Sequence, residues 1–251
     1  MMARLRPEQQ DWDDLGLLDP EWMMLTDPAV DPRDLDAFFG TGRRRVAMVM
    51  EVADRFGVPT GRTVALDFGC GVGRLTRALA EHFDLVTGID IAPSLVTRAR
   101  ELNSAFPRCS FAVNATADLR MFADAQFDLV YSEHVLQHCP STETILGYVR
   151  EFLRVTKSSG LVVFQLPAHI PYRQRIQPRR RAYALLRRLG VTREVLYHSL
   201  GLQPVRMRSM AEEKVRSALE RMGAELRHVE VDEDTPESKA IRSRRYFVEK
   251  R

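Results

Sequence analysis

The sequence predicts an α/β fold with a mostly parallel, seven-stranded sheet covered by helices on both faces. Two observations lead to this prediction. Segments of strand length alternate with segments of helical length, and the residues of the strand-length segments are nearly all apolar. Such strands are typical of parallel sheets that are buried on both sides. The chain has 251 residues, 45% hydrophobic and 28% charged, which is enough for one such domain with a small additional lobe.

The expected strands are, in chain order, residues 63–68, 85–90, 109–113, 127–132, 160–165, 225–231 and 244–249. Pro93 fits the first turn of one connecting helix. Ser209 and Glu212 have the spacing of a capping box before the last helix. A loop, residues 232–238, joins the last two strands in place of a helix, so we expect an antiparallel strand at the edge of the sheet.

Four parts follow from this pattern. We expect residues 1–42 to form an N-terminal arm or lid and residues 43–170 to form the core of the α/β domain, whose first helix is expected at 43–56. Residues 171–205 are a helical cap inserted where a sheet connection normally needs only a few residues. Residues 206–251 complete the sheet. Because the cap follows a sheet strand, we expect it to overhang the edge where open α/β sheets bind ligands.

Charge is segregated along the chain. Residues 8–36 contain ten acidic residues and one basic residue, whereas residues 173–208 contain ten arginines and one acidic residue. In one interpretation, Arg179, Arg180 and Arg181 pair with the acidic residues and close the arm over the site. In the other, the cap covers a ligand pocket and favours an anionic or amphipathic small molecule, because arginine binds carboxylates, phosphates and sulfates well.

Several classes of protein are disfavoured by the composition. No apolar run approaches the roughly 18 residues of a membrane-spanning helix, so we expect no membrane span. The N-terminus lacks the apolar stretch of a secretory signal, which makes the cytoplasm the expected location. The three cysteines are widely spaced and odd in number, which predicts neither a disulfide framework nor a zinc site. The sequence gives no expectation for the oligomeric state.

A glycine-rich loop follows the first expected strand. Residues 64–73 read Val-Ala-Leu-Asp-Phe-Gly-Cys-Gly-Val-Gly, so Asp67 precedes glycines that allow a tight turn and close approach of backbone N–H groups to a ligand. Asp90 lies 23 residues beyond Asp67, at the end of the second strand, where a carboxylate can accept hydrogen bonds from both hydroxyls of a ribose. The pattern predicts a nucleoside cofactor. Its Gly-x-Gly-x-Gly spacing and preceding acid differ from the dinucleotide fingerprint.

The segments LDFGCGVGRLTRAL and GIDIAPSLVTRAR resemble the class I S-adenosylmethionine-dependent methyltransferases that act on small molecules. The resemblance extends from about residue 38 to 166 and, more weakly, to 251. It implies a Rossmann-like fold and S-adenosyl-L-methionine as the cofactor. The cofactor-binding residues that it implies are Asp67, Gly69, Gly71, Gly73, Arg74, Asp90, Ile91, Asn114, Ala115 and Ser132.

Two of these positions have a second interpretation. The family usually has an acidic residue where this chain has Asn114, so either Asn114 or a backbone carbonyl contacts the adenine, or Asn114 is simply a turn residue. Arg74 either reaches the methionine carboxylate or is a surface arginine beside Arg77.

Methyl transfer to a hydroxyl requires alignment and removal of a proton. His134 and His138 follow the fourth strand and would share one face if residues 133–138 form a helical turn. Either could be a general base, or they could be structural, hydrogen-bonded histidines. A divalent metal held by both imidazoles with Glu133 or Gln137 is a third, disfavoured alternative, and we expect no metal.

The predicted function is methyl transfer from S-adenosylmethionine to a small molecule, at a hydroxyl or carboxyl oxygen. The tetrapeptide Asn/Asp-Pro-Pro-aromatic of many nucleic-acid N-methyltransferases is absent, so no nucleic acid is expected as a partner. The alternatives are a non-catalytic S-adenosylmethionine-binding regulator or accessory protein and an NAD-type oxidoreductase on a related fold.

Overall fold

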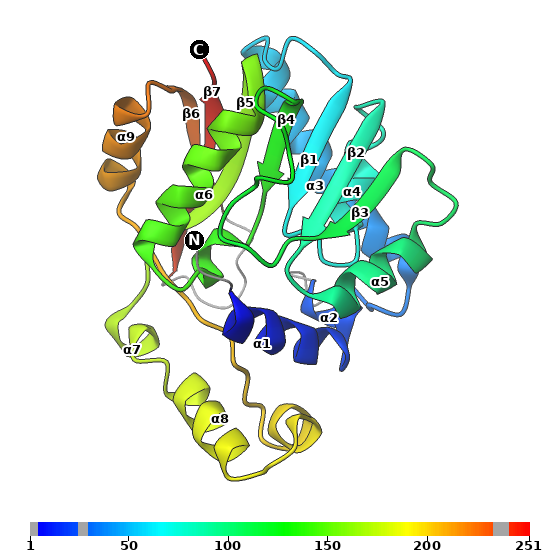
Figure 1. Ribbon diagram of the computed structural model, residues 1–251, viewed down its shortest axis with the longest axis vertical. Helices are drawn as coiled ribbons and strands as arrows, with labels where there is room; N and C mark the ends of the chain where they lie inside the picture. Colours follow the sequence, from blue (N-terminus) through cyan, green and yellow to red (C-terminus); the bar gives the residue numbers. More distant parts are fainter. Residues whose placement is uncertain (1–4, 25–29, 233–240) are drawn as a thin grey trace.

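The computed structural model describes residues 5–24, 30–232 and 241–251, with a seven-stranded sheet at the centre (Figure 1). The strands are β1 (Val64–Phe68), β2 (Leu85–Asp90), β3 (Cys109–Val113), β4 (Phe127–Ser132), β5 (Thr156–His169), β6 (Glu225–Asp232) and β7 (Arg242–Glu249). Their order is β3-β2-β1-β4-β5-β7-β6. Strands β1 to β5 pair in parallel, and β7 is antiparallel to both of its neighbours. The predicted fold class is confirmed.

The predicted position of the antiparallel strand is wrong. Strand β7 lies between β5 and β6, so the edge strand on this side of the sheet is β6. The side chains of Tyr246, Phe247 and Val248 are fully buried, as is usual in a central strand. Most of the connection expected at residues 232–238 lies outside the described residues.

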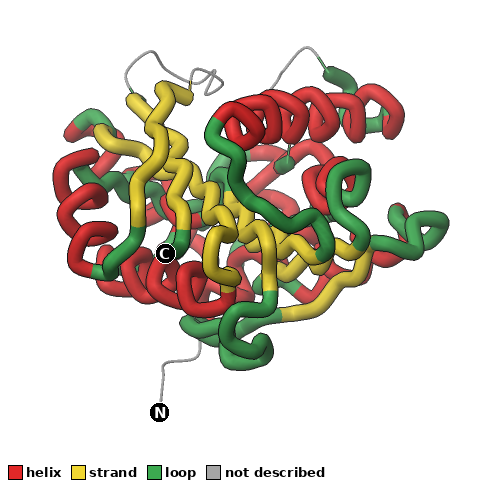
Figure 2. The backbone as a smooth tube through the Cα atoms, turned by 90° about the horizontal axis from the view of Figure 1, so that it is seen from above, coloured by secondary structure: helices red, strands yellow, loops and turns green. Residues whose placement is uncertain are grey.

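Helices cover both faces of the sheet (Figure 2). The core helices are α3 (Leu35–Arg55), α4 (Arg74–Leu79), α5 (Pro93–Leu102), α6 (Thr142–Val155) and α9 (Glu212–Arg221). On one face, α3 and α4 pack against the sheet around Tyr131. On the other face, α6 and α9 pack around Val130 and Val162.

Two helix starts differ from their predictions. The helix expected at 43–56 begins at Leu35, because the Asp34 side chain accepts a hydrogen bond from the Ala37 amide (3.0 Å). The boundary placed at residue 42 therefore falls within α3. The capping box of Ser209 and Glu212 is also wrong, since α9 follows Ala211 and has no side-chain cap. Instead, residues 208–210 bond to the core through amides that reach the carbonyls of Gln137 and Pro167.

The arm lies across the carboxyl ends of β2 and β3. It contains α1 (Arg6–Gly16) and α2 (Pro20–Met23). The Gln9 side chain donates to the Ile91 carbonyl (3.1 Å), and Asp13 accepts from the Ser94 amide at the start of α5 (2.7 Å). The cap contains α7 (Tyr172–Arg175), α8 (Pro178–Arg188) and the short helix η2 (Val195–Ser199). Helix α8 lies beyond α1 when viewed from the sheet (Figure 1). Within the described ranges, no helix has both the length and the apolar composition needed to cross a membrane.

Candidate active site

The glycine loop makes a tight turn between β1 and α4. Gly69 and Gly71 have left-handed backbone conformations, with φ of 79° and 53°. A Cβ atom on Gly69 would lie 2.1 Å from Val135 Cγ2, which follows β4. The Gly69 and Cys70 amides bond to the Ile89 carbonyl in β2. Glycine is therefore required at position 69 for the loop to pass beneath Val135.

Asp90 joins this loop to the end of β2. Its Oδ2 accepts a hydrogen bond from the Gly71 amide (2.9 Å), and its Oδ1 accepts from the Ala92 amide (3.0 Å). Burial raises the pKa of Asp90, although these backbone N–H groups oppose the shift. Each carboxylate oxygen has two lone pairs, so Asp90 can still accept hydrogen bonds from two ligand hydroxyls.

Asp67 is a buried carboxylate with one oxygen unsatisfied. Oδ2 accepts from the Thr76 hydroxyl (2.6 Å), whereas Oδ1 has no hydrogen-bond partner among the described residues. Burial raises the pKa of Asp67 to about 7. A bound ammonium group would satisfy the free oxygen and favour the ionised form.

The loops expected near adenine contact the arm. The Ile91 and Ala115 carbonyls accept hydrogen bonds from Gln9 and from the Leu5 amide. Asn114 donates to the Asp118 carbonyl (3.0 Å) and accepts from the Thr116 hydroxyl (2.8 Å). Both polar groups of the Asn114 side chain are thus bonded within its own loop, as the turn interpretation requires.

The remaining cofactor candidates lie on either side of the glycine loop. Arg74 is half-buried and donates to the Thr41 hydroxyl (3.2 Å), so it is not a simple surface arginine. The neighbouring Arg77 stacks on Phe39, with its guanidinium carbon 3.2 Å from the ring centroid. Ser132 is buried at the end of β4, and its hydroxyl has no partner among the residues described.

Four polar residues cross the sheet in one row. Glu133 follows β4, Gln165 lies on β5, Arg245 on β7 and Glu230 on β6, with Arg245 in register with both Gln165 and Glu230. Because side chains alternate between the faces of a strand, Arg245 shares the face of Phe247, against which α3 packs.

Arg45 of α3 and Asp232 of β6 complete a buried charge cluster with Glu133, Arg245 and Glu230. Arg245 lies 2.9 Å from Glu133 Oε1 and 3.2 Å from Asp232 Oδ1. Arg45 contacts the same two oxygens at 3.2 and 3.4 Å. Burial alone would raise the pKa of Glu133, but Arg245, His134 and Arg45 lower it to about 2. Glu133 therefore remains ionised at neutral pH.

Replacing Arg245 with methionine is expected to destabilise the fold by about 3 kcal/mol, because buried carboxylates lose a partner. This loss of stability lies at the low end of the range for a broken buried ion pair, because Arg45 still contacts Glu133 and Asp232. Chemical denaturation measures this loss. The matched variant Arg216→Met, which breaks an exposed pair with Glu212, should cost about 1 kcal/mol or less. Equal losses in the two variants would contradict the role of the cluster.

His134 lies beside this cluster in an unusual backbone conformation. Its φ is 58°, its amide donates to Gln165 Oε1 (3.3 Å), and its Nε2 lies 3.7 Å from Glu133 Oε1. Burial lowers the pKa of His134, although the charges of Glu133 and Asp232 oppose the shift. The imidazole is therefore neutral at pH 7, as a general base must be.

His138 is held by two hydrogen bonds elsewhere. Its Nδ1 lies 2.6 Å from the Arg206 carbonyl oxygen, so Nδ1 carries the proton, and Nε2 accepts from the Gln137 amide (3.3 Å). Burial lowers its pKa to about 4. The condition for a shared face of the two histidines, a helical turn at 133–138, is not met: the helix η1 spans only Leu136–His138, and His134 has a left-handed backbone. The contacts favour the structural interpretation for His138.

The metal alternative fits the structure poorly. Among the described residues, one group of potential ligands, Glu133, His134 and Asp232, has its ligand atoms within 4.8 Å of one another. His138 is not part of it. Glu133 Oε1 and Asp232 Oδ1 already face the guanidinium groups of Arg45 and Arg245, which would repel a divalent cation.

Comparison with known proteins shows a similarity to methyltransferases. Residues 66–164 match the model of a methyltransferase domain. The 2-methyl-6-phytyl-1,4-hydroquinone methyltransferase of Synechocystis sp. is 40% identical over 107 residues, which cover 42% of this chain and 32% of that protein. Ajmaline N-methyltransferase of Rauvolfia serpentina is 31% identical over 132 residues, which cover 50% of this chain and 43% of that protein. The matched region thus spans less than half of either relative.

A solved structure has the same fold over nearly the whole chain. Magnesium protoporphyrin IX methyltransferase of Synechocystis PCC 6803, determined with bound SAH, aligns with a TM-score of 0.64 and 19% identity, covering 98% of this chain and 99% of that one. Residues 66–164 of the chain therefore match a methyltransferase domain, and the whole chain has the fold of an S-adenosylmethionine-dependent methyltransferase. The resemblance seen in its sequence is confirmed.

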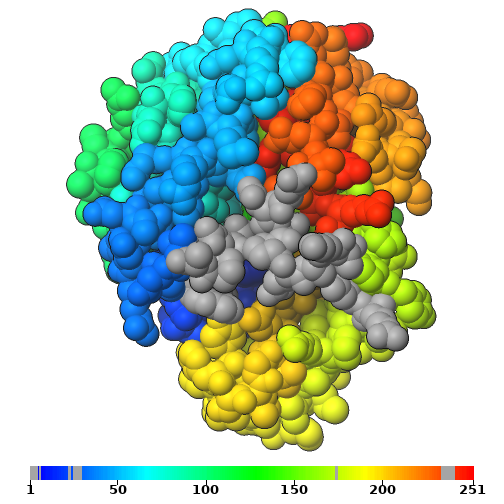
Figure 3. Space-filling view, turned by 180° about the vertical axis from the view of Figure 1, so that it is seen from behind, coloured from blue at the N-terminus to red at the C-terminus, as the bar shows by residue number. Residues whose placement is uncertain are grey.

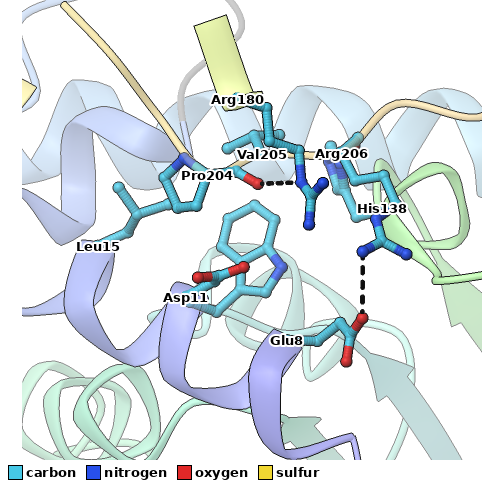
Figure 4. A pocket seen from close by; sticks show the side chains of 9 residues that line it. Glu8, Asp11, Leu15, His138, Arg180, Pro204, Val205 and Arg206 are labelled. Carbon is cyan, nitrogen blue, oxygen red and sulfur yellow. Dashed lines mark hydrogen bonds and ion pairs between the residues drawn. The ribbon is translucent and has the colours of Figure 1, made fainter. Parts of the chain in front are cut away.

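A small pocket lies between the arm, the cap and His138 (Figure 4). Its cavity volume is about 10 Å³, the size of a site for one water molecule. The lining residues are Glu8, Asp11, Trp12, Leu15, His138, Arg180, Pro204, Val205 and Arg206. Burial raises the pKa of Asp11 to about 6. Trp12 packs edge-on against His138, with ring centroids 5.0 Å apart. The pocket therefore borders the core next to η1.

Acidic residues of the arm pair with arginines, but not with those predicted. Asp14 contacts Arg187 (3.6 Å) and Arg193 (2.8 Å), and Glu8 contacts Arg206 (3.5 Å; Figure 4). Neither Arg179 nor Arg181 forms an ion pair with a described residue. Helical periodicity explains the difference, because Arg180, Tyr183 and Arg187 share one face of α8 while Arg181 lies on another. We call the Asp14 and Glu8 pairs the latch.

The substitution Asp14→Asn removes two of the latch pairs and is expected to speed hydrogen exchange in α1 and α8. Partly exposed ion pairs contribute about 1 kcal/mol or less each, so the global free energy of unfolding should change little. Hydrogen exchange followed by mass spectrometry makes this measurement. Glu220→Gln on the exposed side of α9 is the matched control and should leave α1 unchanged. Wild-type exchange of α1 in Asp14→Asn would refute the latch.

Proposed function

We propose that this chain transfers a methyl group from S-adenosylmethionine to an oxygen atom of a small molecule, either a hydroxyl or a carboxyl. The observation that carries the proposal is the placement of His134, held neutral by burial, at the carboxyl edge of the sheet that also carries the glycine loop and Asp90. The named activities of the relatives support methyl transfer to small molecules.

The residues at this edge fit S-adenosylmethionine. The unpartnered Oδ1 of Asp67 suits the ammonium of its amino-acid part. Asp90 has lone pairs for the ribose hydroxyls, and Ile91 offers an apolar contact for adenine. Arg74 is proposed to bind the carboxylate of the same amino-acid part. When bound, the cofactor supplies a methyl group on a sulfonium, which is a good leaving group.

The protein's own residues then align the acceptor and remove its proton. His134 accepts the proton of an acceptor hydroxyl, and the negative charges of Glu133 and Asp232 stabilise the imidazolium that forms. Gln165 holds the His134 backbone, so the ring position depends on β5. A carboxylate acceptor needs no base, and its reaction would be independent of His134.

The acceptor is proposed to be anionic or amphipathic, because the cap that borders the site contains arginines and leucines. Small phenols, hydroxy acids and long-chain carboxylic acids therefore make a suitable panel, with the corresponding amines as controls. The test is incubation with methyl-labelled S-adenosylmethionine, followed by mass spectrometry and NMR of the products. Label in an O-methyl group supports the proposal. Label on nitrogen or carbon, or no turnover with any acceptor, contradicts it.

A further inference from the structure

The outward face of α8 combines apolar and basic side chains without an acidic residue. Arg181, Leu185, Arg188 and Leu189 fall on one side of the helix at spacings of three, four and seven residues. The exposed fractions of Leu185 and Leu189 are 59% and 72%. Tyr172 on the adjacent α7 is 76% exposed. We call these five residues the cap surface.

The latch does not account for this charge. It occupies Arg187, Arg193 and Arg206, which face the arm. The side chains of Arg181 and Arg188 make no ion pair or hydrogen bond with any residue in the described ranges. The single acidic residue of the cap, Glu194, already pairs with Arg193. The cap surface therefore carries positive charge that no carboxylate of the cap neutralises.

The cap that carries this surface projects from the body of the molecule. In the view from behind, the yellow and yellow-green cap forms a separate lobe below the core (Figure 3). A projecting lobe can meet a flat surface without interference from the sheet domain.

We propose that the cap surface docks on the face of an anionic lipid bilayer. The arginine charges attract the negative headgroups, while Leu185, Leu189 and Tyr172 enter the boundary between headgroups and acyl chains. The long arginine stems can lie along the apolar layer with their guanidinium groups at the phosphates. This docking does not depend on the methyl-transfer proposal.

The side chains favour a bilayer over other polyanions. Binding to nucleic acid would use arginines on phosphates but would leave the two leucines exposed, since neither can stack on a base. An acidic protein would neutralise the charge, but it would need a surface shaped to fit the helix. A bilayer needs no such shape to accommodate both the exposed leucines and the unpaired arginines of one helix face.

The test is co-sedimentation of the full chain with vesicles of phosphatidylcholine, with and without phosphatidylglycerol. Binding is expected only with phosphatidylglycerol and should weaken as salt rises. Removing two charges with Arg181→Gln and Arg188→Gln should weaken it about 30-fold, because each arginine near such a surface contributes about 1 kcal/mol. Replacing Leu185 and Leu189 with serine should weaken it about 10-fold or more.

Matched controls separate this surface from general charge and apolarity. Arg150→Gln with Arg221→Gln removes the same number of charges from exposed positions on α6 and α9. Met48→Ser with Met121→Ser removes two exposed apolar side chains from the surface of the sheet domain, outside the cap. Both controls should bind as the wild type does. Absence of wild-type binding at low salt, equal weakening in the controls, or binding to a single-stranded RNA but not to vesicles would overturn the proposal.

Discussion

Replacing Asp90 with alanine is expected to weaken the binding of S-adenosylmethionine by a factor of about 100 or more. The change would remove the two charge-assisted hydrogen bonds that we propose Asp90 accepts from the ribose hydroxyls, each contributing about 1.5–3 kcal/mol. It also removes the bonds that Asp90 accepts from the Gly71 and Ala92 amides, so the glycine loop loses one of its connections to the end of β2 and keeps those to the Ile89 carbonyl. Isothermal calorimetry measures the affinity.

The matched control is Asp84→Ala, an exposed carboxylate just before the same strand, which should bind the cofactor as the wild type does. Circular dichroism establishes that both variants fold. If folded Asp90→Ala binds within a factor of two of the wild type, the assignment of Asp90 to the ribose is wrong.

Replacing His134 with alanine is expected to lower the rate of methyl transfer to a hydroxyl about 10²- to 10⁴-fold, while cofactor affinity stays unchanged. The pH dependence follows from the direction of the pKa shift. Because the pKa of His134 is lowered, the wild-type imidazole is already deprotonated at neutral pH, and the rate should fall only as pH drops below about 6.5. The variant should lack this fall in rate at low pH, the acid limb of the pH–rate profile.

Two controls accompany this experiment. His138→Gln should keep the acid limb of the wild type, because His138 is bound to the Arg206 carbonyl and to Gln137. Treatment with EDTA should leave the rate unchanged. A wild-type rate in His134→Ala, or activity abolished by EDTA and restored by a divalent ion, would refute a metal-independent histidine base.

The sheet could be predicted because its signals are local. Each strand from β1 to β4 is a short apolar run that ends at a glycine or polar residue, and hydrophobicity alone marks these limits. The insertion of β7 beside β5 could not be predicted this way. It depends on pairing between segments that are about 80 residues apart in sequence, and no local pattern encodes that choice.

The part of the candidate site that lies within one sequence motif could be predicted. Asp67, the three glycines and Asp90 lie within 24 residues and meet at one edge because parallel strands end together. Arg45, Asp232 and Arg245 were missed, because they come from three distant elements and meet only in the folded chain. An arginine at an inward position of an apolar strand was the available signal for Arg245.

The same limit explains the latch. The opposite charges of the arm and the cap indicate that the two attract each other, but the pairing depends on which face α8 turns toward α1. That orientation is fixed by burial of Tyr183 and Leu196, which charge counting does not reveal.

The central claim is that the glycine loop, Asp67 and Asp90 form a binding site for S-adenosylmethionine. Calorimetric titration of the wild-type chain with S-adenosylmethionine, and separately with NADH, tests it most directly. We predict saturable one-to-one binding of S-adenosylmethionine, lost in Asp90→Ala and kept in Asp84→Ala, and no binding of NADH. Saturable binding of NADH, or no heat of binding with S-adenosylmethionine, would contradict the claim.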